Sequence, residues 1–266
     1  MRTDYRDDGV VALPGALGSE CMTLALEAYE WSLDNPGPGA SNLPNQASGT
    51  FFQDLANPQA FEQYFDLVNH PDLVAILKEL FVGKHAWFMY EQVFKKHSGS
   101  TRRTPWHQDT PYLPVGGNDL AVIWISFDNV DRDSTLEFVM KSHRGTLFDG
   151  SRFDPRDDTA PLYDHADYPR LPDIEANRNQ YPIVGWPCSP GDVIVFHPSM
   201  LHGGGATTGT QLRRTLSLRY FGEDAVIAER PGAKVANRPK NLHPLHRVRQ
   251  NPAGSPFRHA DFPQTY

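Results

Sequence analysis

Five short apolar segments after residue 85 constrain the fold more than any other feature of the chain. Each is rich in β-branched and aromatic residues or alternates with polar ones, and turn residues separate them, which is typical of β-strands. In order they read AWFMYEQVFKKH, LAVIWISFDNV, TLEFVM, DVIVFH and RRTLSLRYF. Several short strands of this kind predict a closed or double-sheet, mainly β core.

The first third of the chain favours helices. GVVALPG near the start predicts one short strand. The expected helices cover residues 17–35, 61–69 and 71–81. In the first helix, Ser19 is the expected N-cap, and Leu24, Ala28 and Trp31 recur at helical spacing as a stripe facing the core. We therefore expect flanking helices packed on the outside of the β core.

Length and charge exclude several classes of protein. The chain has 266 residues and a formal net charge of −7, which is unfavourable for nucleic-acid binding. We expect a single domain over residues 1–266, a cytoplasmic location and no membrane span, because no sufficiently long apolar run occurs. Cys21 and Cys188 match no zinc spacing and are expected to be buried free thiols.

Two polar segments lack a clear secondary structure. Residues 150–185 contain seven acidic and four basic residues and several prolines, and long irregular segments inside a domain are usually functional or disordered. We interpret residues 151–184 as a possible lid insertion, with a decorative surface loop as the alternative. The segment from Val226 onward is basic and rich in proline, and we expect it to wrap the core irregularly.

A metal site is predicted from two motifs. In TPWHQDTPY, His107 and Asp109 are separated by one residue, so an extended strand turns both side chains toward the same face. FHPSMLHGGG offers His202 as a second histidine, with His197 as a competitor on the far side of Pro198. Two histidines and one carboxylate, with the other positions open, are typical of mononuclear non-haem Fe(II) oxygenases.

These motifs resemble the phytanoyl-CoA dioxygenase family of Fe(II)- and 2-oxoglutarate-dependent oxygenases. The resemblance runs from about Gly9 to Ala225 and is strongest in VFKKHSGSTRRTPWHQDTPY, STLEFVMKSHRG and SPGDVIVFHPSMLHGGG followed by RRTLSLRYFG. It implies a double-stranded β-helix, or jelly-roll, core and the ligand set His107, Asp109 and His202. The chain departs from the family at Val-Met-Lys before Ser142, where relatives commonly have Pro-Gly.

The co-substrate, a dicarboxylate, needs a fixed cation for its far carboxylate. The resemblance points to Arg213, which shares its strand face with Thr215, while Arg214 faces the other way and stays an alternative. Lys96 resembles a family lysine near the co-substrate, and Gln108 is a weaker candidate for the same site. Three aromatic residues could line the pocket or simply pack in the core: Trp106, Tyr112 and Trp124.

The resemblance implies hydroxylation of an unactivated C–H bond of a small molecule, with O2 consumed and succinate and CO2 released. Halogenases of the superfamily replace the carboxylate with a small residue, so Asp109 favours oxygen transfer. Desaturation or cyclisation by the same oxidant stays open. The alternatives from other classes are a non-catalytic jelly-roll binding module and a zinc hydrolase that uses the same three ligands. The prime substrate and the oligomeric state are not predicted.

Overall fold

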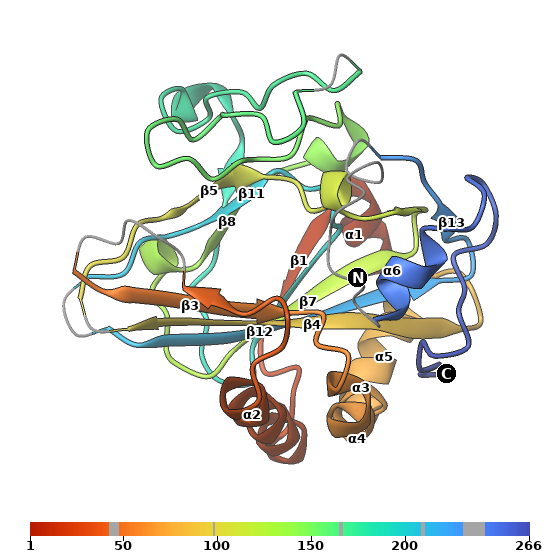
Figure 1. Cartoon of the computed structure of the whole chain (residues 1–266). Helices are drawn as coiled ribbons and strands as arrows, with labels where there is room; N and C mark the ends of the chain where they lie inside the picture. Colours follow the sequence, from red (N-terminus) through yellow and green to blue (C-terminus); the bar gives the residue numbers. More distant parts are fainter. Residues whose placement is uncertain (43–47, 98, 165–166, 209–210, 231–242) are drawn as a thin grey trace.

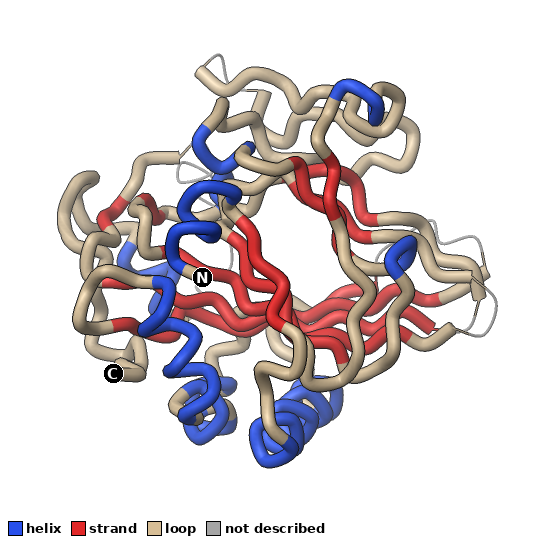
Figure 2. Tube along the Cα trace, turned by 180° about the vertical axis from the view of Figure 1, so that it is seen from behind, coloured by secondary structure: helices blue, strands red, loops and turns tan. Residues whose placement is uncertain are grey.

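Two antiparallel sheets face each other and form the core of the protein (Figures 1 and 2). The computed structural model describes residues 1–42, 48–97, 99–164, 167–208, 211–230 and 243–266. The large sheet has the order β1 (Val10–Leu13), β10 (Val193–Phe196), β7 (Leu120–Ser126), β12 (Arg213–Gly222), β4 (Ala86–His97), β3 (Thr50–Leu55) and β2 (Ser41–Asn42). The small sheet has the order β5 (Thr104–His107), β11 (His202–Gly204), β8 (Leu136–Val139) and β9 (Ile183–Val184). This arrangement confirms the predicted mainly β, jelly-roll core.

Short elements complete the fold at the edges of these sheets. A third sheet pairs β6 (Val115–Gly116) with β13 (Val226–Ile227). The helices are α1 (Arg2–Asp8), α2 (Ser19–Asp34), α3 (Ala60–Gln63), α4 (Phe65–Val68), α5 (Pro71–Leu80) and α6 (Pro244–Val248). The 3-10 turns are η1 (Thr110–Tyr112), η2 (Arg132–Ser134), η3 (Ser142–Arg144) and η4 (Arg178–Gln180). Among the described residues, no helix combines the length and apolar character that a bilayer crossing requires.

Helices α2 to α5 cover one face of the large sheet (Figure 1). In α5, Leu73, Ile76, Leu77 and Leu80 are buried, at the spacing of one helix face. They belong to the largest apolar cluster, which also contains Leu216, Leu218 and Tyr220 of β12. Because strand side chains alternate, the other face of β12 is left for the interior between the two sheets.

That interior face of β12 is polar along much of its length. Arg213, Thr215, Ser217 and Arg219 occupy alternate positions and are all at most 5% exposed. The partners of β12 are β4 and β7, so the strand is central in the sheet. A polar row buried at the centre of a sheet is costly to desolvate, and it therefore marks the site rather than ordinary core.

Several details differ from the sequence-based expectations. The strands β1, β4, β7, β8, β10 and β12 were anticipated, but α1, α6 and the short strands β2, β3, β6, β9, β11 and β13 were not. The extended segment expected through His107 and Asp109 ends at His107, and Asp109 begins a 3-10 turn. The N-cap of α2 is Gly18, and Ser19 is the first helical residue; the Gly18 N–H bonds to Asp72 Oδ2 at 2.8 Å instead. The buried stripe of α2 comprises Cys21, Ala25, Ala28, Tyr29 and Ser32, so Leu24 and Trp31 lie only at its margin. The helix expected over residues 61–69 is two short helices, α3 and α4.

Candidate metal centre and co-substrate site

The three predicted metal ligands lie together at the end of the small sheet. His107 ends β5 and pairs directly with His202, the first residue of β11, and their ring centroids are 4.3 Å apart. Asp109 Oδ1 lies 3.6 Å from His107 Nε2 and 3.9 Å from His202 Nε2. The three side chains can therefore place one ligand atom each around a single ion.

Backbone contacts fix the orientation of both imidazoles. Nδ1 of His107 is 2.8 Å from the carbonyl of Pro105, and Nδ1 of His202 is 2.9 Å from the carbonyl of Met200. A carbonyl only accepts, so each Nδ1 carries the proton and each Nε2 presents a lone pair toward Asp109. Carbonyl contacts of this kind are the usual support of metal-binding histidines.

The charges at the centre favour the protonation states that a metal needs. Burial would raise the pKa of Asp109, but the positive charge of Arg219 outweighs it and holds that pKa well below its usual range. Burial, aided by the neighbouring His107, lowers the pKa of His202 to about 4. A carboxylate with two neutral imidazoles fits a divalent iron with open coordination positions.

Arg219 is a site residue that the sequence analysis missed. Its Nη2 lies 2.8 Å from Asp109 Oδ2 and 2.7 Å from Gln92 Oε1, and its guanidinium lies 4.7 Å from the centre of the Tyr90 ring. Strand alternation within RRTLSLRYF, already used to choose Arg213, would have placed Arg219 on the same face. The contact with Asp109 required the structure, since it joins the two sheets.

Two buried cations lie side by side further along this interior. Lys96 and Arg213 are cross-strand partners in β4 and β12, 0% and 4% exposed. Lys96 Nζ donates to the carbonyl of Gly205 at 3.0 Å, and Arg213 Nη1 donates to the same carbonyl at 3.2 Å. In the part of the chain that the structure describes, neither cation forms an ion pair with a carboxylate.

The cation pair is close to the metal ligands along β11. Arg213 Nη2 would lie 3.5 Å from a Cβ atom on Gly204, which is two residues after His202 in the same strand. Two residues of strand span roughly 7 Å, about the length of a short dicarboxylate. Burial, followed by the charges of Arg213 and Arg103, lowers the pKa of Lys96 well below its ordinary value, so an anion between the cations and the metal would stabilise its charged form.

The remaining candidates for co-substrate binding are placed differently. Arg214 points away from the interior and pairs with Asp128, 2.8 Å between Nη2 and Oδ1. Thr215 lies on the same face as Arg213. The side chain of Gln108 is engaged elsewhere, because its Oε1 accepts from the Phe148 N–H at 2.9 Å and its Nε2 donates to the carbonyls of Thr146 and Ser199. Gln108 therefore fixes the chain after η3 and has no amide group free for a co-substrate.

His197 is separate from the metal ligands. Its Nδ1 accepts from the Ser199 N–H at 3.1 Å, and its Nε2 lies 3.3 Å from the carbonyl of Gly117. The turn at residues 198–201 thus leaves His202 alone in the position opposite His107. Of the three aromatic candidates, Trp106 packs in an apolar cluster with Leu201.

The described residues 151–164 and 167–184 lie over the end of the small sheet that carries His107 and His202 (Figure 1). The ring of Phe153 is 5.2 Å from that of His107, and Phe153 is 38% exposed with a positive φ of 53°. The segment is anchored more firmly than its composition suggested. Its Leu171 and Ile174 are buried in a cluster with Trp106, and its Glu175 accepts a 3.0 Å bond from Trp106 Nε1.

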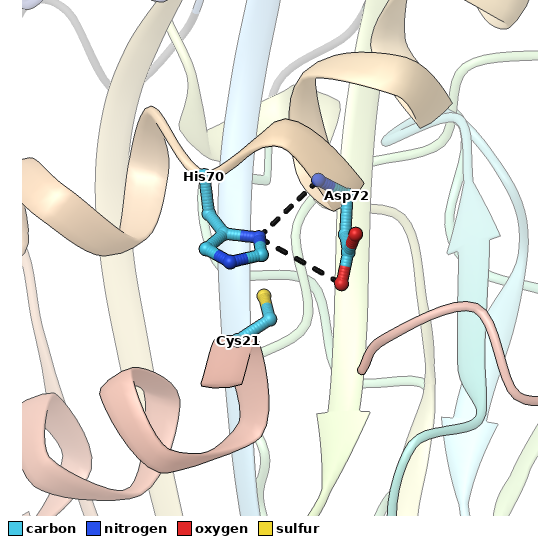
Figure 3. A group of neighbouring side chains, drawn as sticks. All are labelled: Cys21, His70 and Asp72. Carbon is cyan, nitrogen blue, oxygen red and sulfur yellow. Dashed lines mark hydrogen bonds and ion pairs between the residues drawn. The ribbon is translucent and has the colours of Figure 1, made fainter. Parts of the chain in front are cut away.

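A second group of potential ligands, Cys21, His70 and Asp72, lies between α2 and α5 (Figure 3). His70 is the N-cap of α5, and its Nδ1 accepts from the Asp72 N–H at 3.2 Å. Asp72 Oδ2 already accepts from the Gly18 N–H. Burial raises the pKa of the Cys21 thiol to about 12, so this group is a helix cap beside a free thiol. Cys188 is also a buried free thiol, as expected.

Comparisons with known proteins identify related sequences. The sequence model of the family "Phytanoyl-CoA dioxygenase (PhyH)" matches residues 5–215. Human peroxisomal phytanoyl-CoA dioxygenase is 26% identical over 198 residues, which cover 71% of this chain and 55% of that protein. The chain thus spans about half the length of the curated relatives that it matches.

Solved structures share the fold. The epimerase SnoN from nogalamycin biosynthesis, in complex with Fe3+, alpha ketoglutarate and nogalamycin RO, superposes with a TM-score of 0.69 at 19% identity, covering 100% of this chain and 97% of that one. The alpha ketoglutarate dependent carbocyclase SnoK has a TM-score of 0.69 at 21% identity, covering 99% and 94%. These similarities confirm the jelly-roll architecture.

Proposed function

Because the chain belongs to the phytanoyl-CoA dioxygenase family, we propose that it is an Fe(II)- and 2-oxoglutarate-dependent dioxygenase that hydroxylates an unactivated C–H bond of a small molecule. Succinate and CO2 are the products of the co-substrate. The observation that supports this most is the juxtaposition of the His107, Asp109 and His202 cluster with the cation pair Lys96–Arg213. A metal-binding module or a zinc hydrolase would need only the cluster of two histidines and a carboxylate. Neither would explain the two buried positive charges of Lys96 and Arg213.

Each residue then has a distinct role. His107 and His202 would hold the metal through Nε2, and Asp109 through a carboxylate oxygen. Arg213 and Lys96 hold the far carboxylate of 2-oxoglutarate, with the Thr215 hydroxyl beside them. When bound, iron, O2 and 2-oxoglutarate supply the oxidising chemistry, while the protein supplies orientation and a dry interior. Residues 151–184, through Phe153, keep water from the metal.

The outcome at the substrate is the finer part of the proposal. SnoN is named an epimerase and SnoK a carbocyclase, so one fold supports several oxidative outcomes. Hydroxylation is the outcome that we propose, because the carboxylate ligand Asp109 is retained and favours oxygen transfer. Desaturation and cyclisation would give products that differ from a hydroxylated one in mass.

The test is turnover by the iron-loaded protein in air. Candidate small molecules are screened for those that accelerate succinate formation from 2-oxoglutarate, and the product is identified by mass spectrometry. We expect one oxygen atom, labelled when 18O2 is used, to appear in the product together with one succinate. A protein that binds neither iron nor 2-oxoglutarate would refute the proposal. A zinc-dependent hydrolysis without succinate would favour the hydrolase alternative.

A further inference from the structure

Arg219 lies where the central strand of the large sheet is irregular. It pairs with Tyr90, whereas the next residue, Tyr220, pairs with Phe88, so β4 has one extra residue, Met89, at this point. Such bulges redirect side chains and occur next to active sites. Here the irregularity lies beside an arginine that crosses the interior to reach Asp109 in the loop after β5 of the opposite sheet.

The guanidinium of Arg219 is incompletely satisfied. Its side chain is 6% exposed, and Nη2 makes both of its hydrogen bonds, to Asp109 and Gln92. Within the described residues, Nε and Nη1 are buried and have no hydrogen-bond partner. An arginine cannot lose its proton to relieve this, and a buried donor of a charged group that lacks a partner keeps its full cost of desolvation. An acceptor from outside the chain is therefore expected.

The charges around Arg219 and Asp109 indicate which kind of acceptor would pair with the unpaired donors of Arg219. Asp109 and Arg219 form an ion pair, 2.8 Å between Oδ2 and Nη2, so their charges offset each other. A divalent metal held by His107, Asp109 and His202 would add two positive charges, and Asp109 is the one carboxylate of that described group. A carboxylate offers acceptor oxygens and negative charge together, so it suits both the metal and the unmet donors of Arg219.

We propose that Arg219 is a positioning residue that holds Asp109 by Oδ2, so that Oδ1 alone faces the metal, and that its remaining donors receive a carboxylate bound beside the metal. This inference rests on the proposed function. The carboxylate has two possible sources: the end of 2-oxoglutarate nearest the metal, or an acidic group of the prime substrate. In either case Arg219 couples metal binding to anion binding.

The experiment compares Arg219→Gln and Arg219→Lys with wild type and with Arg214→Gln as the matched control, since Arg214 pairs with Asp128 away from the site. Circular dichroism and thermal denaturation establish folding. Calorimetry measures Mn(II) affinity, and the visible spectrum of the Co(II) form reports the coordination number. We expect Arg219→Gln to weaken Mn(II) binding about 10–100-fold and to alter the Co(II) spectrum as Asp109 turns, while Arg219→Lys restores Mn(II) affinity to within a few-fold.

Two further titrations identify the source of the carboxylate. The first titration measures 2-oxoglutarate affinity with saturating Mn(II). If this affinity is at least tenfold lower in both Arg219 variants than in wild type, the carboxylate is assigned to the co-substrate. If 2-oxoglutarate affinity is unchanged, each protein is saturated with Mn(II) and 2-oxoglutarate and then titrated with acetate. If wild type binds acetate and the variants do not, the carboxylate is assigned to an acidic prime substrate.

Three results would overturn the inference: Mn(II) affinity of Arg219→Gln within twofold of wild type, an unchanged Co(II) spectrum, or no change with either anion. If Arg219→Gln does not fold, the test uses Arg219→Lys, which keeps the buried charge. The inference then depends on whether this variant binds 2-oxoglutarate or acetate more weakly than wild type. A wild type that binds neither Mn(II) nor 2-oxoglutarate would instead refute the proposed function, so the two failures are distinct.

Discussion

Replacing Arg213 with alanine tests the co-substrate site most directly. The side chain is 4% exposed and lies beside Lys96 with no carboxylate partner among the described residues. Losing one buried, charge-assisted contact costs roughly 2–5 kcal/mol. We expect the lower part of that range, because removal of Arg213 also removes a charge that lowers the pKa of Lys96, and the lysine can then take over part of the attraction. An effect of 2 kcal/mol corresponds to about 30-fold in affinity.

The matched control is Arg214→Ala, one residue along the same strand. Arg214 and its partner Asp128 are 28% and 17% exposed in their side chains, so their ion pair is screened by water and contributes about 0–1 kcal/mol to stability. We expect no change in 2-oxoglutarate affinity. The assay is calorimetric titration of 2-oxoglutarate into each Mn(II)-loaded protein without O2. Equal losses in the two variants, or a larger loss for Arg214→Ala, would refute the assignment of the interior face of β12.

Three other variants test separate parts of the structure. His202→Ala should abolish Mn(II) binding, whereas His197→Ala should leave Mn(II) affinity within a few-fold, as measured by calorimetry; the reverse order would exchange their roles. Burial raises the pKa of Glu91 from 4.5 to about 8, so its contribution to stability is complete below pH 4.5 and is lost as the pH rises toward 8, at up to about 1.4 kcal/mol per pH unit. Glu91→Gln should reduce the pH dependence of the free energy of unfolding, measured with urea, over this interval. An unchanged pH slope would contradict the raised pKa of Glu91. Phe153→Gly should preserve 2-oxoglutarate affinity and raise the ratio of succinate to hydroxylated product, because water reaches the metal more easily; an equal ratio would mean that Phe153 is surface decoration.

The parts of the structure that were predictable from the sequence depend on short-range periodicity. Strand alternation separated Arg213 from Arg214. The spacing of His107 and Asp109 indicated a common site, but the expected single strand was wrong, because β5 ends at His107 and Asp109 follows in a helical conformation as the N-cap of η1. Contacts between distant segments were not predictable in this way. The bond from Arg219 joins β12 of the large sheet to Asp109 in the loop after β5, and the N-cap of α2 was misplaced because Gly18 bonds to Asp72 on another helix.

Residues 151–184 also make contacts that short-range periodicity could not predict. Its composition, with prolines and mixed charges, correctly indicated that residues 151–184 would be mostly irregular. Composition could not reveal that Leu171 and Ile174 insert into an apolar cluster with Trp106, because they are isolated apolar residues without periodicity. It could not place Phe153 over His107 either, since that contact depends on how the anchored portion directs the rest of the segment.

The ligand set is divided between the two sheets, and this has a thermodynamic consequence. The proposed metal ligands belong to the small sheet and the loop after β5, whereas Arg213, Lys96 and Arg219 belong to the large sheet. A metal and a dicarboxylate that engage both sets act as a non-covalent cross-link between the halves of the sandwich. Ligands that bind only the native state stabilise it by mass action, so amide hydrogen exchange should slow in β5 and β11 together with β12. The proposed metal and co-substrate site would then also hold the two sheets in register.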